Sequence, residues 1–176
     1  MQFCQDETKW NGGDGIMGLF DFMKGKKKAA ISAPVKGVCI PIREVADPTF
    51  ADEILGKGMA IKPLDGKVYA PADGKISTLF PTGHAVGITA SDGAEILVHV
   101  GLDTVSLKGQ HFQAVVQADQ EVKAGDLLLE ADLEAISKAG YDTVIPIIIC
   151  NSDEFSDIQC KTEGTVEAGE EVITYK

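Results

Sequence analysis

Two histidines, His84 and His99, lie fifteen residues apart on either side of a predicted turn. His99 stands inside an otherwise apolar, strand-like stretch, residues 95–109, where an imidazole without a partner would lose solvation free energy. A neutral imidazole nitrogen is a competent nucleophile at neutral pH, because its ordinary pKa is about 6.5. Phosphoryl transfer also needs a group that stabilises the phosphoryl oxygens. The pair therefore suggests chemistry in which one ring attacks phosphorus and the other donates a hydrogen bond to the transferred group.

The residues between the histidines predict a β-hairpin that places both rings on one face. With Asp92-Gly93 as a two-residue turn, His99 faces Val86 and is a diagonal neighbour of His84. With Ser91-Asp92 as the turn, the two histidines stand directly opposite each other. A loop of odd length with a bulge would instead separate them onto opposite faces. Thr82 shares the face of His84, and we expect its hydroxyl group to orient that ring.

Two other interpretations of the histidines remain open. They could be hydrogen-bonded polar residues at the surface of a sheet, without a chemical role. They could also belong to a zinc metallopeptidase, but such an enzyme needs a third protein ligand and a metal-bound water. His111 has no ligand-like spacing and is predicted to be a surface residue. We expect no cofactor and no resident metal, with at most an adventitious or partner-shared zinc ion at His84 and His99.

Composition and charge limit the class of partner. The chain has 176 residues and a net charge of −11, and residues 29–176 alone carry −12. A nucleic acid is excluded as a partner because phosphate contacts need a basic surface, whereas a basic protein would be attracted. The alternative is that the acidity only maintains solubility. No apolar run reaches the roughly 18 residues of a spanning helix, and no secretory signal is evident. Four scattered cysteines without a CxxC pair indicate reduced thiols in a cytoplasmic protein.

Short apolar runs separated by Gly, Pro and Asp predict an all-β fold. The sequence also repeats itself: residues 33–37 resemble residues 70–74, and residues 122–126 resemble residues 166–170. We therefore predict an antiparallel β-sandwich or barrel built from a duplicated motif. Helix is expected only in short segments, namely 132–139 with Asp132 as N-cap, Pro48 to Leu55, and Asn151 to Asp157.

The N-terminal residues differ from the remainder of the chain. Residues 1–16 are polar and Gly-rich and predict a flexible extension. Residues 17–28 combine an apolar cluster with four lysines and predict an amphipathic leader capable of at most weak membrane contact. We therefore divide the chain into an extension and leader, 1–28, and one domain, 29–176.

Several motifs, taken together, resemble those of one known family from Met17 to the C-terminus. They are MGLFD (17–21), FADEILGKGMAIKP (50–63), APADGKI (70–76), PTGHAVGI (81–88), EILVHVGLDTVSLKG (95–109) and VKAGD (122–126). The chain resembles glucose-type enzyme IIA, the phosphocarrier of the bacterial phosphoenolpyruvate-dependent sugar phosphotransferase system. The resemblance implies a β-sandwich with its active site in a shallow apolar depression.

The same resemblance implies a role for each site residue. His99 would be the phosphorylated residue, His84 would stabilise the phosphoryl group, and Thr82 would support His84. The family's partners are the basic phosphocarrier HPr and a sugar-specific enzyme IIB domain, and transporters or metabolic enzymes are further candidates under a regulatory role. A monomeric, cytoplasmic protein is expected. The expected partner-binding rim consists of Asp47, Phe50, Ile54, Leu55, Phe80, Val86, Leu97, Val98, Val100, Asp103 and Val105.

Overall fold

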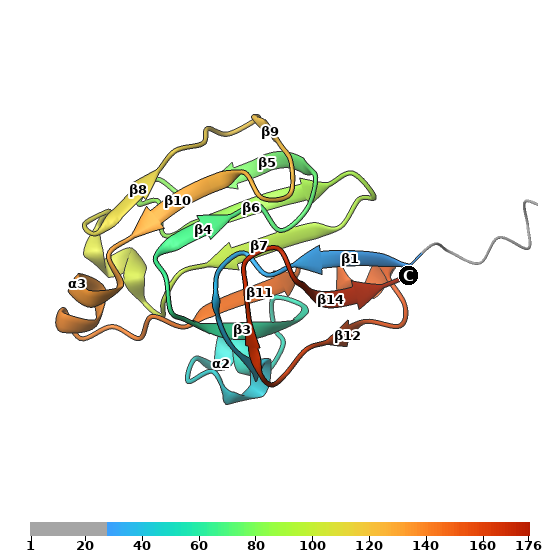
Figure 1. Cartoon of the computed structure of the whole chain (residues 1–176), viewed down its shortest axis with the longest axis horizontal. Coiled ribbons are helices and arrows are strands. Elements are labelled where there is room, and N and C mark those ends of the chain that lie inside the picture. Colours follow the sequence, from blue (N-terminus) through green and yellow to red (C-terminus); the bar gives the residue numbers. More distant parts are fainter. Residues whose placement is uncertain (1–27) are drawn as a thin grey trace, which may run out of the picture.

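The computed structural model describes residues 28–176, which form three antiparallel β-sheets and a few short helices (Figure 1). The largest sheet has eight strands in the order β13-β2-β3-β11-β7-β6-β5-β9. Two three-stranded sheets have the orders β1-β14-β12 and β4-β10-β8. The predicted all-β class is therefore confirmed. The strands are β1 (Ala29–Ser32), β2 (Gly37–Pro41), β3 (Lys57–Pro63), β4 (Lys67–Tyr69), β5 (Gly74–Leu79), β6 (Ala85–Ala90), β7 (Glu95–His99), β8 (Phe112–Ala114), β9 (Glu121–Val122), β10 (Leu127–Ala131), β11 (Ile145–Ile149), β12 (Gln159–Cys160), β13 (Thr165–Val166) and β14 (Glu171–Tyr175).

The predicted duplication is visible in the order of the strands and in the hydrogen bonds between the repeats. The large sheet divides between β11 and β7 into two halves of four strands, β13-β2-β3-β11 and β9-β5-β6-β7, which follow the same order, and each half has its own three-stranded sheet. Ala33 donates to the carbonyl of Glu170, and Ala70 donates in the same way to Asp126, at 2.7 and 2.8 Å. The two repeats also exchange matching hydrogen bonds, from Ser32 to Pro71 at 2.8 Å and from Tyr69 to Pro34 at 2.7 Å. The two halves are therefore related by an approximate two-fold axis.

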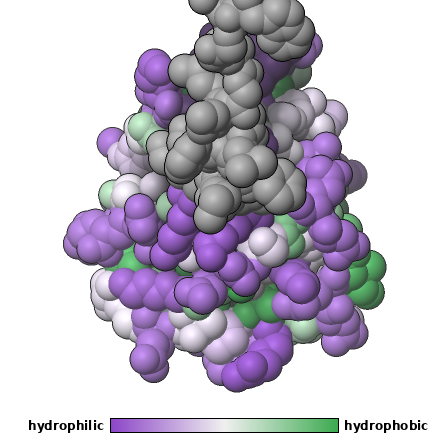
Figure 2. All heavy atoms as spheres, turned by 90° about the vertical axis from the view of Figure 1, so that its right-hand side faces the viewer, coloured by the Kyte–Doolittle hydropathy of each residue, from purple (hydrophilic) through white to green (hydrophobic). Residues whose placement is uncertain are grey.

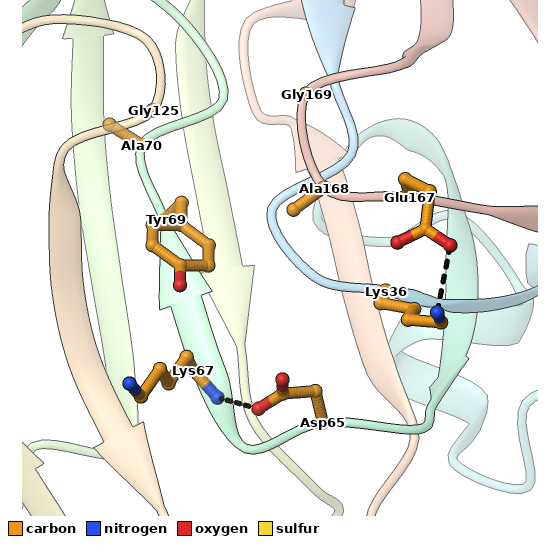
Figure 3. A pocket seen from close by; sticks show the side chains of 9 residues that line it. All are labelled: Lys36, Asp65, Lys67, Tyr69, Ala70, Gly125, Glu167, Ala168 and Gly169. Atoms are coloured by element: carbon orange, nitrogen blue, oxygen red, sulfur yellow. Dashed lines mark hydrogen bonds and ion pairs between the residues drawn. The ribbon is translucent and has the colours of Figure 1, made fainter.

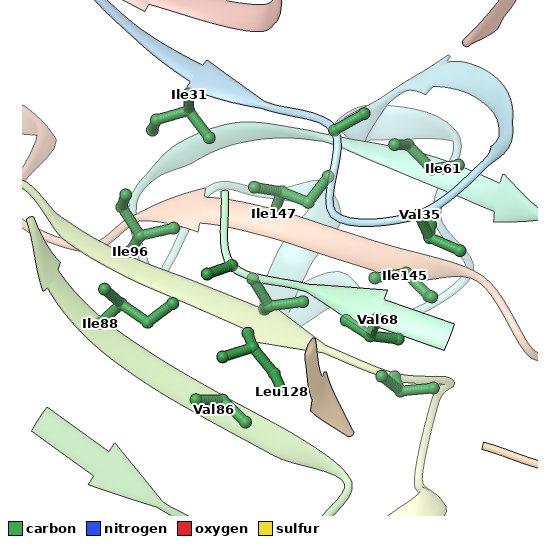
Figure 4. Close-up of a cluster of buried hydrophobic side chains, with 14 of the residues drawn as sticks. Ile31, Val35, Ile61, Val68, Val86, Ile88, Ile96, Leu128, Ile145 and Ile147 are labelled. Atoms are coloured by element: carbon green, nitrogen blue, oxygen red, sulfur yellow. The ribbon is translucent and has the colours of Figure 1, made fainter. Parts of the chain in front are cut away.

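The main hydrophobic core lies between the large sheet and the two smaller ones. Alternate residues of each strand point inward, as the two-residue period of a strand requires. Figure 4 shows isoleucine, valine and leucine side chains from β1, β3, β4, β6, β7, β10 and β11 meeting in this core. Branched aliphatic side chains of this kind favour strands because they pack well on a pleated surface.

A second, smaller cluster covers only one half of the outer face of the large sheet. It consists of Ile40, Ile42, Val45, Phe50, Ala60, Leu102, Val144 and Ile148, with Leu97 packed against it. The 3-10 turn η1 (Ile42–Glu44) and the helix α2 (Pro48–Ala51) supply two of these side chains, Ile42 and Phe50, and Val45 directly follows η1. The outer face of β6 and β7 has no matching cover within the described residues, and this difference between the halves leaves room for a site.

The short helices agree with the predicted segments. Helix α3 (Leu133–Lys138) begins after Asp132, whose carboxylate accepts from the Ala135 amide at 2.9 Å. Helix α2 begins in the same way after Asp47, which accepts from the Thr49 amide at 2.8 Å. Both aspartates satisfy amide groups that the first helical turn leaves unpaired. The 3-10 turn η3 (Ser152–Glu154) also lies within a predicted segment, whereas η1 and the 3-10 turn η2 (Thr104–Leu107) were not predicted.

Both predicted registers of the β6–β7 hairpin are wrong. Ala85 pairs with His99 and Val86 with Val98, so the connecting loop has three residues, Ser91 to Gly93. The Gly93 amide bonds to the Ala90 carbonyl at 2.9 Å, and Gly93 has a φ of 93°. A three-residue loop of this kind uses a left-handed glycine to return the chain to the ladder. The Asp-Gly signal predicted the hairpin correctly but not the length of its loop.

The remaining surface is largely polar. Figure 2 shows one face on which hydrophilic residues dominate and hydrophobic residues form small separate areas. In residues 28–176, no helix is long and apolar enough to cross a membrane. The predicted flexible extension and amphipathic leader, 1–28, lie outside the described residues apart from Lys28. The proposed boundary of the domain at residue 29 therefore stays a prediction.

Candidate active site

His99 is the last residue of β7, and its half-buried ring lies on the outer face of the sheet. Its Nδ1 atom lies 2.8 Å from the carbonyl oxygen of Gly101. Because a carbonyl oxygen only accepts hydrogen bonds, Nδ1 carries the proton and Nε2 keeps its lone pair. The ring of Phe50 packs edge-on against the imidazole, with 5.2 Å between the ring centroids. The arrangement presents Nε2 of His99 as a nucleophile with a fixed orientation.

His84 lies immediately before β6 and is almost completely buried. Its ring centroid is 4.8 Å from that of His99. The hydroxyl group of Thr82 bonds to Nδ1 of His84 at 2.5 Å, as the sequence predicts. The rings of Phe80 and Phe112 pack edge-on against His84 at 5.4 and 6.4 Å. When the Thr82 hydroxyl donates to Nδ1, the proton of the His84 ring is on Nε2, where it can be donated to a bound group.

The two histidines meet although the pairing of the strands would separate them. Since Ala85 is the partner of His99, a regular strand would point His84 toward the opposite face. The hydrogen bonds continue as far as His84, whose carbonyl accepts from the Val100 amide at 2.8 Å, and the chain turns just before it, where Gly83 has a φ of 68° and its amide bonds to the Phe80 carbonyl at 2.7 Å. The prediction that the histidines lie together is confirmed by the distance between their rings, although the observed register alone would place them on opposite faces.

Burial keeps both imidazoles neutral. The loss of solvation lowers the pKa of His84 to about 4, and the neighbouring His99 contributes in the same direction. Burial also lowers the pKa of His99, against the opposing effects of the Gly101 carbonyl and the carboxylates of Asp47 and Asp103. At neutral pH, His99 is therefore the free base that a nucleophile requires.

Part of the predicted rim is exposed. Ile54 is 70% exposed, Val105 54%, and Phe80 and Leu55 37% each. Asp103 is exposed, whereas Leu97 and Asp47 are half-buried. Phe80 packs against His84, and the carboxylates of Asp47 and Asp103 give the surroundings of His99 a negative edge.

Four of the predicted rim residues are buried instead. Val86, Val98 and Val100 are 0% exposed and belong to the main core, where Figure 4 shows Val86 among its neighbours. The observed register puts Val86 and Val98 on the inner face, so a partner cannot contact them. Phe50 is 4% exposed because it fills the second cluster beneath His99. Its inclusion in the rim was wrong, and its place is behind the nucleophile.

Two features near His99 were not predicted from the sequence. The first is the Gly101 carbonyl, which fixes the tautomer of His99. Thr104, in the same His-Val-Gly-Leu-Asp-Thr stretch, is 0% exposed and bonds to the Val100 carbonyl at 2.6 Å. The closeness of Thr104 to His99 in the sequence could have indicated its role. The left-handed backbone at Asp103, which returns Thr104 toward the strand, could not be predicted from the sequence.

Two other features of the surface involve none of the predicted site residues. His111 is exposed, as expected. A hollow between the repeats is lined by Tyr69, Gly169 and an ion pair of Lys36 with Glu167 at 2.8 Å, and it contains none of the predicted site residues (Figure 3). Over residues 28–176, no group of three or more His, Cys, Asp or Glu side chains could hold a metal ion.

Comparison with known proteins decides the family. The model of the family described as "phosphoenolpyruvate-dependent sugar phosphotransferase system, EIIA 1" matches residues 29–155. The chain belongs to this EIIA family. The EIIA components of this system are phosphotransferases with a phosphohistidine intermediate.

Individual relatives agree with this assignment. The chain is 41% identical over 160 residues to the glucose-specific EIIA component of Halalkalibacterium halodurans, covering 87% of this chain and 92% of that protein. It is 46% identical over 136 residues to the β-glucoside-specific EIIBCA component of Dickeya chrysanthemi, which covers 77% of this chain but only 22% of that longer protein. The fold matches glucose permease IIA from Mycoplasma capricolum with a TM-score of 0.79 and 41% identity, covering 85% of this chain and 96% of that one. The EIIA fold therefore occurs both as a separate chain and within larger components.

Proposed function

We propose that this protein is a phosphocarrier that accepts a phosphoryl group on Nε2 of His99 from phospho-HPr and passes it to an enzyme IIB domain. The single observation that supports this assignment of atoms is the hydrogen bond from Nδ1 of His99 to the Gly101 carbonyl. It leaves one ring nitrogen with a lone pair, on the outer face of the sheet. Membership of the EIIA family supports the type of reaction.

The transfer needs little from the protein except position and a hydrogen-bond donor. As the bond from phosphorus to the donor breaks, the bond from phosphorus to Nε2 of His99 forms, and no proton has to leave His99 first because Nε2 is already unprotonated. His84, 4.8 Å away between ring centroids, donates from its own Nε2 to a phosphoryl oxygen. Thr82 keeps His84 in the tautomer that can donate.

The surface around the histidines suits two successive protein partners. The exposed side chains of Ile54, Phe80 and Val105 offer apolar contact, and Asp103 offers a negative charge to a basic partner such as HPr. The fusion of EIIA with EIIB in the β-glucoside-specific relatives supports an EIIB domain as the second partner. The EIIB domain and its membrane component determine which sugar is transported, because no step of this reaction brings the sugar to His99.

The mass of the protein after incubation with phosphoenolpyruvate, enzyme I and HPr tests the proposal. The wild-type chain should gain one phosphoryl group, about 80 Da, and His99→Gln should gain none because the nucleophile is lost. His111→Asn is the matched control, since it removes an exposed histidine, and it should be labelled like the wild type. Absence of the mass gain in the wild type, or labelling of His99→Gln, would contradict the assignment.

A second arm separates the roles of the two histidines. His84→Gln should still accept the phosphoryl group from HPr, while its onward transfer to an EIIB domain should be slower because the stabilising donor is lost. Equal loss of both steps would contradict the role of His84 as a donor to the transferred group.

A further inference from the structure

The orientation of the Gly101 carbonyl depends on the groups that bind the peptides on either side of it. Gly101 has a φ of 77°, which an L side chain rarely adopts. A β-carbon at this position would lie 2.5 Å from Cγ2 of Thr104 and 2.7 Å from the Asp142 carbonyl oxygen. The backbone at Gly101 is therefore enclosed by neighbouring atoms, and these atoms fix its conformation.

Three hydrogen bonds hold the two peptide groups that flank Gly101. The Thr104 hydroxyl donates to the Val100 carbonyl at 2.6 Å, and the Gly101 amide donates to the Val144 carbonyl at 2.9 Å. The Leu102 amide donates to the Asp142 carbonyl at 3.0 Å. The one polar atom of these two peptides that is left is the Gly101 carbonyl oxygen, and it accepts from Nδ1 of His99.

Thr104 supplies the only one of these three hydrogen bonds that comes from a side chain. It is one of three buried polar residues in the part of the chain that the structure describes, and it is 0% exposed. The Asp103 backbone before it has a φ of 56°, so the chain turns back and places the hydroxyl beneath the end of β7. A left-handed aspartate costs free energy that the packing around Thr104 has to offset.

We propose that Thr104 is a positioning residue for His99, and that its hydroxyl group holds the Gly101 carbonyl where it selects the Nδ1-protonated tautomer. Without the hydroxyl, the Val100 carbonyl loses its partner, and the peptide between Val100 and Gly101 is held only through the Gly101 amide, so it can tilt and move the Gly101 carbonyl. The Gly101 oxygen then no longer faces Nδ1, and the proton distributes over both ring nitrogens. The consequence for transfer rests on the proposed function of His99, whereas the consequence for the tautomer does not.

The test compares Thr104→Val, which removes the hydroxyl at similar volume, with Thr104→Ser, which keeps it. Nitrogen-15 NMR of the unphosphorylated protein reports the tautomer of His99, and the initial rate of labelling by phospho-HPr reports the reaction. Thr104→Val should show a mixed His99 tautomer and accept the phosphoryl group about tenfold more slowly, since catalytic geometry is sensitive to small displacements. Thr104→Ser should restore the Nδ1-protonated tautomer and most of the rate.

A matched control separates positioning from loss of stability. Ser152 is also buried, and its hydroxyl accepts from the Lys57 amide at 3.2 Å on another element. Ser152→Ala should lower the free energy of unfolding by a similar amount without changing the His99 tautomer. If Thr104→Val does not fold, Asp142→Ala loosens the same enclosure from an exposed position, because Asp142 accepts from the Val144 amide at 2.9 Å, and it should shift the tautomer in the same direction.

The proposal is wrong if Thr104→Val keeps a single Nδ1-protonated His99, or if Ser152→Ala changes the tautomer equally. Failure of the wild-type protein to accept any phosphoryl group would contradict the proposed function instead. The tautomer measurement stands in that case, because it requires no donor protein.

Discussion

At the scale of single residues, the site consists of two imidazoles that the protein keeps neutral by burial and by fixed hydrogen-bond partners. Gly101 accepts from Nδ1 of His99, and Thr82 binds Nδ1 of His84, so that each ring has one nitrogen occupied and one available. The available nitrogens differ in character, one a base and the other a donor. A pair of neutral imidazoles with different free nitrogens is suited to holding a phosphoryl group and releasing it again.

The lowered pKa of His84 predicts that stability falls in mild acid. The folded protein holds His84 neutral down to a pKa of about 4, whereas the unfolded chain binds a proton near its ordinary value. Below pH about 6.5 the unfolded state therefore binds more protons, and the free energy of unfolding decreases with a slope of up to about 1.4 kcal/mol per pH unit. This loss is absent well above pH about 6.5, grows as the pH falls and is complete near pH 4. Urea unfolding at pH about 7.5 and about 5.5 measures it.

Variants of the histidines assign this loss to one residue. His84→Gln should lose less stability between the two pH values than the wild type, and His111→Asn, at an exposed position, should lose as much. The carboxylates titrate mostly below this range and are common to all three proteins. The same pH dependence in His84→Gln and in the wild type would show that the His84 ring is not the group responsible.

At the scale of elements, the outer faces of β6 and β7 determine which side chains a partner can reach. The sequence predicted both strands, the hairpin and the N-cap of α3, because their signals are local. It did not predict the loop of three residues, since two-residue and three-residue loops use the same Asp-Gly pair. An error of one residue in register exchanges the two faces of a strand, so the predicted pairing put Val86 on the face of the histidines. Val98 adjoins His99 in β7 and therefore points to the opposite face in any register. His84 nevertheless lies beside His99, directly after the turn at Gly83.

This correction predicts different effects for Val86 and Ile54. Val86→Ala should lower the free energy of unfolding by about 2 kcal/mol, because it removes buried methyl groups and leaves a cavity in the core. Its rate of phosphoryl transfer should stay unchanged while it is folded. Ile54→Ala, at a 70% exposed side chain, should change stability by less than about 0.5 kcal/mol and should slow transfer from phospho-HPr.

Urea unfolding and transfer rates at low HPr concentration measure both effects on the same samples. If Val86→Ala is stable but transfers slowly, Val86 belongs to the docking surface and the prediction is wrong. If Ile54→Ala keeps the wild-type rate, Ile54 does not belong to that surface.

At the scale of the whole molecule, the duplicated fold carries one site because only one half of its outer face is covered. Ala85 pairs with His99 in one half as Gly58 pairs with Ile148 in the other, so Ile148 occupies the position related to the nucleophile. Ile148 is 0% exposed beneath the second cluster, which η1 and α2 build. The sequence repeats predicted the duplication, but the cover comes from the segment inserted between β2 and β3, for which the other half has no equivalent. The inserted segment also supplies Phe50 to the edge of the open half.

The distribution of charge over the molecule predicts how docking responds to salt. The chain carries a net charge of −11, and Asp103 is exposed beside the histidines. Attraction between this surface and a basic HPr accelerates encounter, and ions screen it over about 10 Å at 0.1 M salt. The second-order rate of labelling by phospho-HPr should therefore fall at least about tenfold between roughly 0.05 and 0.5 M salt. Asp103→Asn removes one charge at the site, tolerates the left-handed backbone there, and should lower both the rate at low salt and its dependence on salt.

The matched control is Glu163→Gln, which changes the net charge equally at an exposed position outside the site. It should leave the rate and its salt dependence close to those of the wild type, because long-range attraction is strongest for charges close to the contact. Asp47 is unsuitable for this comparison, since its carboxylate also caps α2 and its loss would alter the support of Phe50. Equal effects of Asp103→Asn and Glu163→Gln would mean that net charge alone governs encounter. A rate independent of salt would mean that apolar contact governs it, and the acidic edge would then serve solubility only.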